Sequence, residues 1–165
     1  APRRTLEMIS ELLRYQLYGG NQKVSILQEI DYLKTYIALR KLRMSERLRL
    51  RVEFPPELNE LNIYPLLFLP LVENAFKYVG GDYQLDIIMK WENNRISLFI
   101  RNSIPELSAE DEALRKSVDE RQRKGIGLVN LRRRLSLLYP NKHRLETRKE
   151  ETEFVAELMI EIEDI

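Results

Sequence analysis

The sequence predicts an α+β protein, a two-layer α/β sandwich preceded by a helical hairpin. Three observations lead to this prediction. Four segments carry apolar residues at helical spacing, and five shorter segments have the alternating or β-branched pattern of strands. All six glycines fall in three pairs, at 19–20, 80–81 and 125 with 127, where the periodic segments begin or end.

The first two periodic segments predict an antiparallel pair of helices. Residues 6–18 form the first, which ends at the glycine pair 19–20. Ser25 is placed to cap the second, with Gln28 at the position that completes a capping box. The apolar stripe of this second helix continues to about Ser45. The short connection favours a hairpin of two helices.

The middle of the chain predicts a strand and then a helix. Charged and apolar residues alternate over 47–54, and Pro55-Pro56 ends that strand. A helix is predicted over 63–79, with Pro65 near its start and a kink at Pro70.

The rest of the chain predicts two hairpins separated by a loop and a helix. Strands over 84–91 and 95–100 flank a turn at 92–94, and a long polar segment follows over 102–124. A helix over about 128–138 ends at Tyr139-Pro140-Asn141, and strands over 144–148 and 154–162 form the last hairpin. We expect the segment 102–124 to be mobile in the absence of a ligand.

Composition narrows the possible functions. The 165 residues carry a net charge of +1, which gives no overall bias toward nucleic acid or anionic membranes. The absence of cysteine excludes disulfides and thiolate metal sites, and the single histidine excludes a multi-histidine metal site. The longest apolar run, residues 63–72, is too short to span a membrane, and no signal peptide is expected. We therefore expect a soluble piece, which could still belong to a larger membrane protein.

The most informative stretch is Leu69-Pro-Leu-Val-Glu73-Asn74-Ala-Phe-Lys77-Tyr78. Buried polar groups without partners are costly, so three polar residues within one turn of an apolar helix suggest an external ligand. On a helix, Asn74 and Lys77 share a face that can offer an amide oxygen and an ammonium to a metal-phosphate group. The alternative is a solvated helix end that carries an ordinary Glu73–Lys77 pair.

A second motif, Gly125-x-Gly127-Leu128-x-Asn130, opens a helix directly after the long polar segment. Glycines allow close backbone approach, and a helix N-terminus offers free N–H groups and a positive dipole end to phosphate. Taken alone, this pattern is equally compatible with a simple hinge into a helix.

Together the two motifs resemble the GHKL (Bergerat) ATP-binding fold, with Asn-x-x-Lys, two strands, a long loop and Gly-x-Gly-Leu-x-Asn in that order. Residues 69–77 look like the N box of LytS-type sensor histidine kinases, and residues 125–140 look like their G2 box with the helix after it. Residues 12–18 and 29–37 are similar to the paired helices that follow the phosphoacceptor histidine of that family. The resemblance covers nearly the whole chain.

The resemblance implies roles for individual residues. Asn74 would supply an oxygen to Mg²⁺ on the ATP phosphates, and Lys77 would reach a phosphate. Glu73 would help to organise the metal or the attacking group, or would simply pair with Lys77. Tyr78 would pack beside the base or ribose, with ordinary interface packing as the alternative. In the G2 box, Gly125, Gly127 and Leu128 would line the ATP site, and Asn130 would brace the turn. Among the arginines of residues 132–134, one is a candidate for contact with phosphate or a partner domain, and the others are expected to lie in solvent.

Two departures from the family pattern bear on activity. The family's G1 aspartate, which accepts a hydrogen bond from the adenine amino group, is matched here by Asn102 without following glycines. An amide oxygen can still accept that bond, but without the strength of a charged acceptor. The phosphoacceptor histidine would lie upstream of Leu6. His143, expected to be an exposed turn residue, does not replace it, so the chain is not expected to autophosphorylate alone.

The resemblance therefore implies two parts, a partial dimerisation and phosphotransfer hairpin over 1–46 and an ATP-binding domain over 47–165. The implied activity is that of a magnesium-dependent histidine kinase in two-component signal transduction, with ATP and a response regulator as partners. A homodimer is implied for the full-length protein, as is a cytoplasmic location for this domain, in a sensor of the inner membrane.

Three other functions remain open. A degenerate domain would act as a dimerisation module with weak or no nucleotide binding. A gyrase- or MutL-type ATPase is disfavoured because its glutamate base would fall at Pro70. A serine kinase of the anti-sigma type shares the nucleotide motifs, but the preceding hairpin argues against it.

Overall fold

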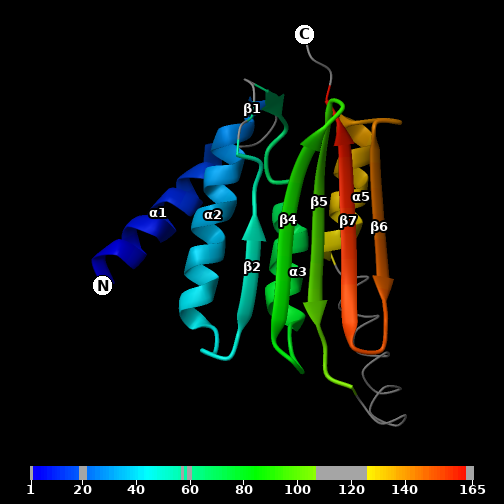
Figure 1. The fold of residues 1–165 in the computed structure, drawn as a ribbon. Coiled ribbons are helices and arrows are strands. Elements are labelled where there is room, and N and C mark those ends of the chain that lie inside the picture. Colours follow the sequence, from blue (N-terminus) through cyan, green and yellow to red (C-terminus); the bar gives the residue numbers. More distant parts are fainter. Residues whose placement is uncertain (1, 19–21, 57, 59–60, 107–125, 163–165) are drawn as a thin grey trace.

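The computed structural model describes residues 2–18, 22–56, 58, 61–106 and 126–162. A five-stranded sheet runs in the order β2-β4-β5-β7-β6, with β2 parallel to β4 and every other pair antiparallel (Figure 1). The bounds are Arg49–Glu53 for β2, Gln84–Glu92 for β4, Arg95–Ser103 for β5, His143–Lys149 for β6 and Glu153–Glu161 for β7. Two short strands, β1 (Val24–Ser25) and β3 (Asn62–Ile63), pair separately.

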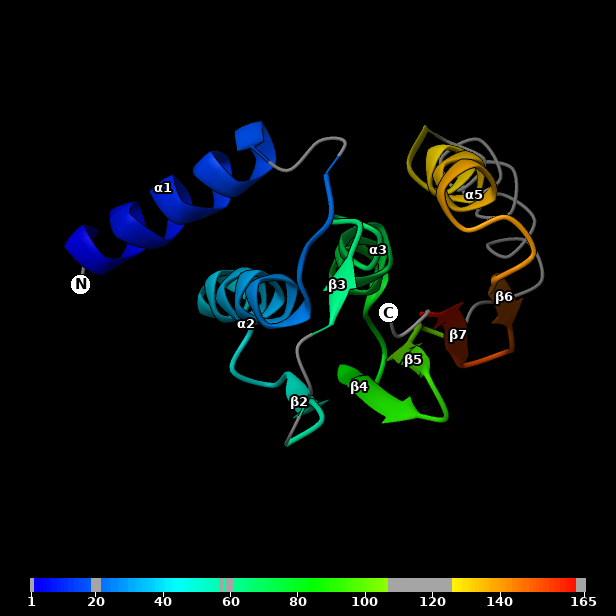
Figure 2. The same ribbon diagram turned by 90° about the horizontal axis from the view of Figure 1, so that it is seen from above.

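The helices of the described residues are α1 (Pro2–Tyr18), α2 (Ile26–Arg43), α3 (Leu69–Tyr78) and α5 (Ile126–Leu138). All of them except α1 cover one face of the sheet (Figure 2). Figure 2 shows α2, α3 and α5 side by side on the same face, with α1 outside α2 and away from the sheet. The predicted two-layer α/β sandwich is therefore confirmed. Within the described residues, none of the helices is long and apolar enough to cross a membrane.

The core lies between the sheet and these helices. On β5, Ile96, Leu98 and Ile100 are at most 2% exposed, and their alternation fixes which face is covered. Leu33 and Ile37 of α2 belong to the same buried cluster. Because α2 contributes to the core of the sandwich, the boundary predicted after residue 46 is not marked by a break in packing, and it stays a prediction.

Several local signals act as predicted. Ser25 caps α2, and Gln28 returns a hydrogen bond to the Ser25 backbone, so the capping box is confirmed. The turn between β4 and β5 has Asn93 and Asn94 at φ 51° and 61°, a geometry that asparagine tolerates well. Asn141, at φ 61°, reverses the chain between α5 and β6.

The helix predicted over 63–79 is shorter than expected. It begins only at Leu69, and Ile63 belongs to strand β3. Pro70 lies in the first turn, where its missing N–H has no helical partner, so it starts the helix instead of kinking it. The residues between β3 and α3 fill the core in a non-helical conformation, with Leu67 and Phe68 fully buried.

Three other predictions need correction. Asn102 and Ser103 belong to strand β5, not to a loop, because both continue its pairing with β7. Residues 107–124 of the predicted loop and Gly125 lie outside the described residues. Gly127 is inside the first turn of α5, which begins at Ile126. His143 is the first residue of β6 and is half-buried, and its Nδ1 lies 2.7 Å from the carbonyl oxygen of Tyr139.

A tight joint connects the end of α3 to the end of β5. The Ser103 hydroxyl donates to the Gly80 carbonyl at 2.6 Å, and the Gly80 N–H donates to the Ser103 carbonyl at 2.9 Å. Gly81 has φ 59°, and a Cβ there would lie 2.8 Å from the Ile104 carbonyl oxygen. Only glycine fits at this position without displacing the backbone.

We predict that Gly81→Ala lowers the free energy of unfolding by about 1–3 kcal/mol, because the new methyl meets fixed backbone at a left-handed position. The matched control is Gly127→Ala, where a Cβ would meet nothing within 4 Å. In that helical position alanine should add about 0.5–1 kcal/mol. Urea denaturation measures both changes, and equal effects of the two substitutions would contradict the assigned role of Gly81.

Candidate functional site

Helix α3 presents the polar residues predicted to bind a ligand. Asn74 and Tyr78 are four residues apart on one face of the helix, and both are half-buried. Lys77 is exposed in the last turn, where a cation is favoured by the helix dipole. Its Nζ lies 5.4 Å from the centroid of the Tyr78 ring. The amide and the ammonium are thus both accessible to a ligand.

Glu73 lies near a cation of α2. Among the described residues it forms no ion pair with Lys77; the charge that acts on it is Arg40 of α2. Desolvation raises the pKa of Glu73, and the positive charge of Arg40 opposes that rise. The Arg40 guanidinium lies 5.7 Å from the centroid of the Phe76 ring, so α2 brings a cation to this side of α3.

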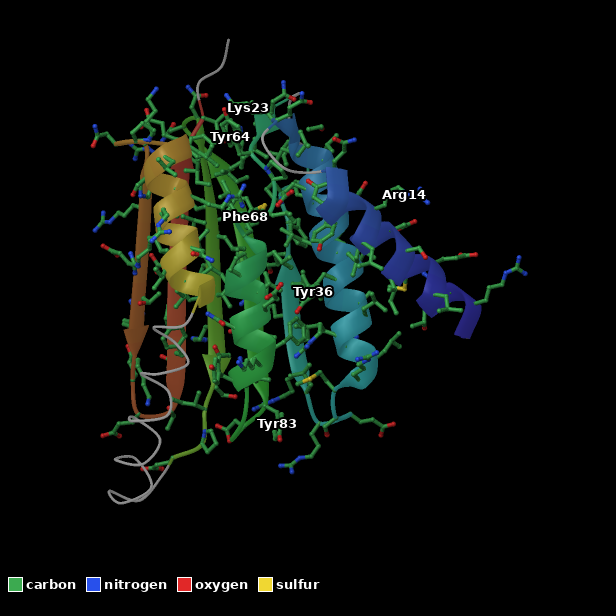
Figure 3. The ribbon with its side chains drawn as sticks, turned by 180° about the vertical axis from the view of Figure 1, so that it is seen from behind. Arg14, Lys23, Tyr36, Tyr64, Phe68 and Tyr83 are labelled. Atoms are coloured by element: carbon green, nitrogen blue, oxygen red, sulfur yellow. The ribbon has the colours of Figure 1, made fainter. Side chains whose placement is uncertain are left out.

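Figure 3, seen from the helix side, shows Tyr36 between α2 and α3. Its ring meets Phe76 edge to face at a centroid distance of 6.4 Å. Burial raises the pKa of Tyr36 to about 12. The side of α3 toward α2 is therefore packed with aromatic rings and carries one arginine, while Asn74 and Tyr78 lie on another face of the helix.

Asn102 is positioned by strand β5. It is 1% exposed and continues the covered row of Ile96, Leu98 and Ile100. Its Nδ2 donates weakly to the Ser103 carbonyl at 3.4 Å. Asn102 therefore places a side-chain amide on the face of the sheet that the helices cover, at the end where β5 finishes.

Helix α5 contributes the third part of the site. Gly127 opens its first turn, Leu128 is half-buried, and Asn130 is exposed. The N–H groups of this first turn have no partner within the helix. Gly125 lies outside the described residues, so the bracing role predicted for Asn130 stays a prediction.

The arginine run 132–134 divides between surface and interior. Arg132 and Arg133 are exposed as expected, although Arg132 also donates to the Leu145 carbonyl at 3.2 Å. Arg134 is half-buried and donates to the carbonyls of Pro65 and Leu66 at 3.1 and 3.3 Å. The described contact of Arg134 is therefore with the turn before α3.

The three parts meet at one end of the sandwich. Helix α3 ends, strand β5 ends and helix α5 begins at this end of the molecule (Figures 1 and 3). Tyr83 is labelled at the same end in Figure 3. The Ser103–Gly80 hydrogen bonds join two of these parts directly. Asn74, Tyr78, Asn102 and Gly127 therefore come from three different elements to one end of the molecule.

The donors at this end suit a hard cation bound together with phosphate. Within the described residues, no three His, Cys, Asp or Glu side chains gather into a metal site. One amide oxygen, that of Asn74, is available on α3, and Glu73 precedes it. Magnesium keeps several waters and commonly takes its other ligands from substrate phosphates, so a single protein oxygen fits this ion better than calcium.

The sequence analysis did not anticipate two buried charged groups. Glu29 on α2 is fully buried, and its carboxylate accepts hydrogen bonds from Tyr15 and from the Leu66 N–H. Asp86 on β4 is 2% exposed and accepts from Arg101 at 2.6 and 3.0 Å. Asp86 interrupts the apolar run of its strand, which was the available signal. Glu29 lies three residues after Ile26 and four before Leu33, on the apolar face of α2, and a charged residue in that register was the available signal.

A separate hollow of about 700 Å³ lies on the opposite face of the sheet. It is lined by side chains such as Ile88, Phe99 and Met159, which alternate with the covered residues of their strands. It therefore has no wall in common with the end that carries Asn74 and Asn102.

Comparisons with known proteins agree with this arrangement. Residues 1–48 match the family model described as Histidine kinase. The chain is 27% identical over 145 residues to the sensor protein kinase HptS of Staphylococcus aureus, covering 85% of this chain and 28% of that protein. The chain thus spans under a third of the length of its curated relatives.

Two solved structures show the same fold. The catalytic domain of histidine kinase ThkA has a TM-score of 0.53 at 17% identity, over 86% of this chain and 96% of that one. The chain has the fold of a histidine kinase catalytic domain. Histidine kinase ShkA, solved in complex with AMPPNP, has a TM-score of 0.57 at 12% identity, over 96% of this chain and 35% of ShkA. The predicted GHKL architecture is therefore confirmed, whereas the LytS subtype is not tested by these comparisons.

We predict that Arg40→Met raises the pKa of Glu73, because the opposing positive charge is removed while desolvation remains. A titration of the Glu73 side-chain carboxyl carbon by NMR measures the change. The matched control is Lys41→Met, which removes a cation from the next, exposed position of α2. An equal shift in both variants, or no shift in Arg40→Met, would contradict the assignment of Arg40 as the charge that acts on Glu73.

Proposed function

We propose that this chain is the ATP-binding catalytic part of a two-component sensor histidine kinase. In this proposal it binds Mg-ATP and donates the γ-phosphoryl group to a histidine outside the chain, from which it passes to a response regulator. The observation that carries the proposal is the meeting of Asn74, Asn102 and the first turn of α5 at one end of a histidine kinase fold. The relative with the same fold that was solved with AMPPNP supports a nucleotide as the ligand.

In the proposed mechanism the protein positions charged groups and supplies little covalent chemistry. Asn74 would hold Mg²⁺, which neutralises phosphate charge when it is bound. Lys77, exposed at the end of α3, would contact a phosphate, and the free N–H groups of α5 would face the phosphates. Gly125 and Leu128 would complete the lining at the start of α5. Glu73 would orient the attacking imidazole, with its pKa set by burial and by Arg40.

At the other end of the nucleotide, Asn102 would accept a hydrogen bond from the adenine amino group. Tyr78, half-buried next to Lys77, would pack against the base or ribose. Asn130 would brace the turn before α5.

The proposal includes the wider setting of the protein. The LytS subtype, the division into a hairpin over 1–46 and a catalytic domain over 47–165, and a homodimer in the full-length protein are parts of it. We place the domain in the cytoplasm, as part of a sensor anchored in the inner membrane. Because the acceptor histidine is proposed to lie outside the chain, the chain alone is expected to bind ATP without phosphorylating itself.

We predict that Asn74→Asp weakens Mg-ATP binding at least tenfold, about 1.4 kcal/mol, because it turns a metal-binding amide into a second negative charge facing the phosphates. Lys77→Ala should weaken binding by a similar factor through loss of a cation. Isothermal titration calorimetry measures both constants.

Two matched controls change the same residue types away from the site. Asn62→Asp lies in β3 and Lys90→Ala lies on β4, and both positions are exposed. Neither should change the dissociation constant more than twofold. If the intact protein showed no heat of nucleotide binding at all, the kinase proposal would fail, and a degenerate signalling module would be the better description.

We further predict that Asn102→Asp strengthens ATP binding about fivefold, because a carboxylate accepts the adenine hydrogen bond about 1 kcal/mol more strongly than an amide. GTP binding should not gain, since guanine presents a carbonyl where adenine has the amino group. Competition between ATP and GTP, each titrated against both proteins, measures this selectivity. An equal gain for the two nucleotides would show that Asn102 does not contact the base.

A further inference from the structure

The turn between β3 and α3 is held from both sides at a single residue, Leu66. Leu66 has φ 64°, a left-handed conformation that non-glycine residues rarely adopt. Its N–H donates to Glu29 Oε1 at 2.8 Å, and its carbonyl accepts from Arg134 Nη1 at 3.3 Å. Arg134 Nη2 also donates to the Pro65 carbonyl at 3.1 Å. Helix α2 and helix α5 therefore both fix the segment that leads into α3.

Glu29 extends this junction to α1. Its carboxylate is fully buried, and the oxygen that does not bind Leu66 accepts a hydrogen bond from the Tyr15 hydroxyl of α1. The Tyr15 ring stacks on Tyr32 of α2 at a centroid distance of 4.5 Å. Burial raises the pKa of Glu29, while Tyr15, the Leu66 N–H and the charge of Arg134 oppose that rise. One carboxylate thus connects α1, α2, the turn before α3 and, through that turn, α5.

This junction lies at the opposite end of α3 and α5 from the candidate site. The two helices run antiparallel, with Leu66 just before the start of α3 and Arg134 in the last part of α5 (Figure 1). Arg134 follows Gly127 by seven residues, which is roughly 10 Å along a helix. Tyr64 and Phe68, labelled in Figure 3, flank Leu66 in sequence and mark this end of the molecule. Helices α3 and α5 are therefore tied at one end and carry the proposed ligand groups at the other.

We propose that Glu29 and Arg134 are positioning residues for the nucleotide site. They fix the spacing between α3 and α5, and the Tyr15 hydrogen bond makes that spacing depend on where α1 lies. A displacement of α1 that breaks this bond leaves the Glu29 carboxylate held only by Leu66, so that the carboxylate can shift with the Leu66 N–H and change the spacing of the two helices. The proposal rests on the proposed nucleotide binding, and it adds a route by which α1 regulates it.

The first test measures Mg-ATP affinity in Tyr15→Phe, which removes one hydroxyl and keeps the stacked ring. We expect affinity to fall about threefold in Tyr15→Phe and about tenfold in Arg134→Met. Arg134→Lys keeps the positive charge but loses the two guanidinium hydrogen bonds to the Pro65 and Leu66 carbonyls. Its affinity for Mg-ATP should lie between those of wild type and Arg134→Met. The matched control is Arg132→Met, which loses one arginine–backbone bond to β6 and should stay within twofold of wild type.

The second test measures position without a nucleotide. The chain has no cysteine, so Val129→Cys and Lys90→Cys place two spin labels specifically, one near the start of α5 and one on the sheet. Both side chains are exposed. Pulsed electron paramagnetic resonance should show a shifted or broadened distance when Tyr15→Phe is added, in samples frozen from a temperature at which circular dichroism shows a folded protein. A purely structural role for the junction would lower the melting temperature but leave this distance unchanged.

The two tests separate the failure of this inference from the failure of the proposed function. If wild type binds Mg-ATP and Tyr15→Phe and Arg134→Met bind it equally well, the positioning role is overturned and the function stands. An unchanged label distance in Tyr15→Phe overturns the role whether or not nucleotide binds. If wild type binds no nucleotide, the proposed function and the role of Glu29 and Arg134 in it are both overturned.

Discussion

The structure depends on the burial of one face of the sheet. Alternate residues of β5, from Ile96 to Asn102, are nearly inaccessible to solvent, and so are most of their partners on β4 and β7, such as Ile87 and Leu158. Removing that apolar surface from water is the main favourable contribution to folding, and it requires helices across the whole covered face. Because the helices pack on apolar side chains along their length, groups that meet a ligand must gather where the helices end. The position of the candidate site follows from this constraint.

The two ends of the helical layer are built differently. At the end that includes Leu66, a buried carboxylate and a half-buried guanidinium hold backbone groups in place. At the other end, α3 stops at Tyr78 and α5 starts at Ile126 with N–H groups that have no helical partner. Within the described residues, side chains of α2 and α5 bind the backbone at the first end, whereas at the second end the described hydrogen bonds join α3 to β5 through Ser103 and Gly80. This asymmetry connects the packing of the fold to the proposed control by α1.

The parts of the fold that could be predicted from the sequence are those held by interactions between residues close together in the chain. The Ser25 cap, the Asn93-Asn94 turn and the strand alternation act between neighbours in the chain, and these predictions are confirmed. The late start of α3 was missed, because the residues before Leu69 are apolar enough for a helix and only their packing keeps them irregular. The hydrogen bond between Glu29 and Leu66 was missed because the two residues are 37 positions apart in the chain. A contact between residues so far apart in the chain leaves no recognisable pattern in the local sequence around either of them.

The asparagine at position 102 illustrates how burial restricts the chemistry of the site. Asp86, on the uncovered face of the neighbouring strand, shows what a buried carboxylate requires, since Arg101 binds it through two nitrogens. Asn102 is equally buried on the covered face, and the donor proposed for it is the nucleotide itself. An aspartate there would hold an uncompensated charge in the empty site, which is costly, whereas a neutral amide is not. If the chain binds ATP as proposed, asparagine at this position lowers the affinity for adenine and stabilises the empty domain, and the proposed binding then depends more strongly on the phosphate end of the site.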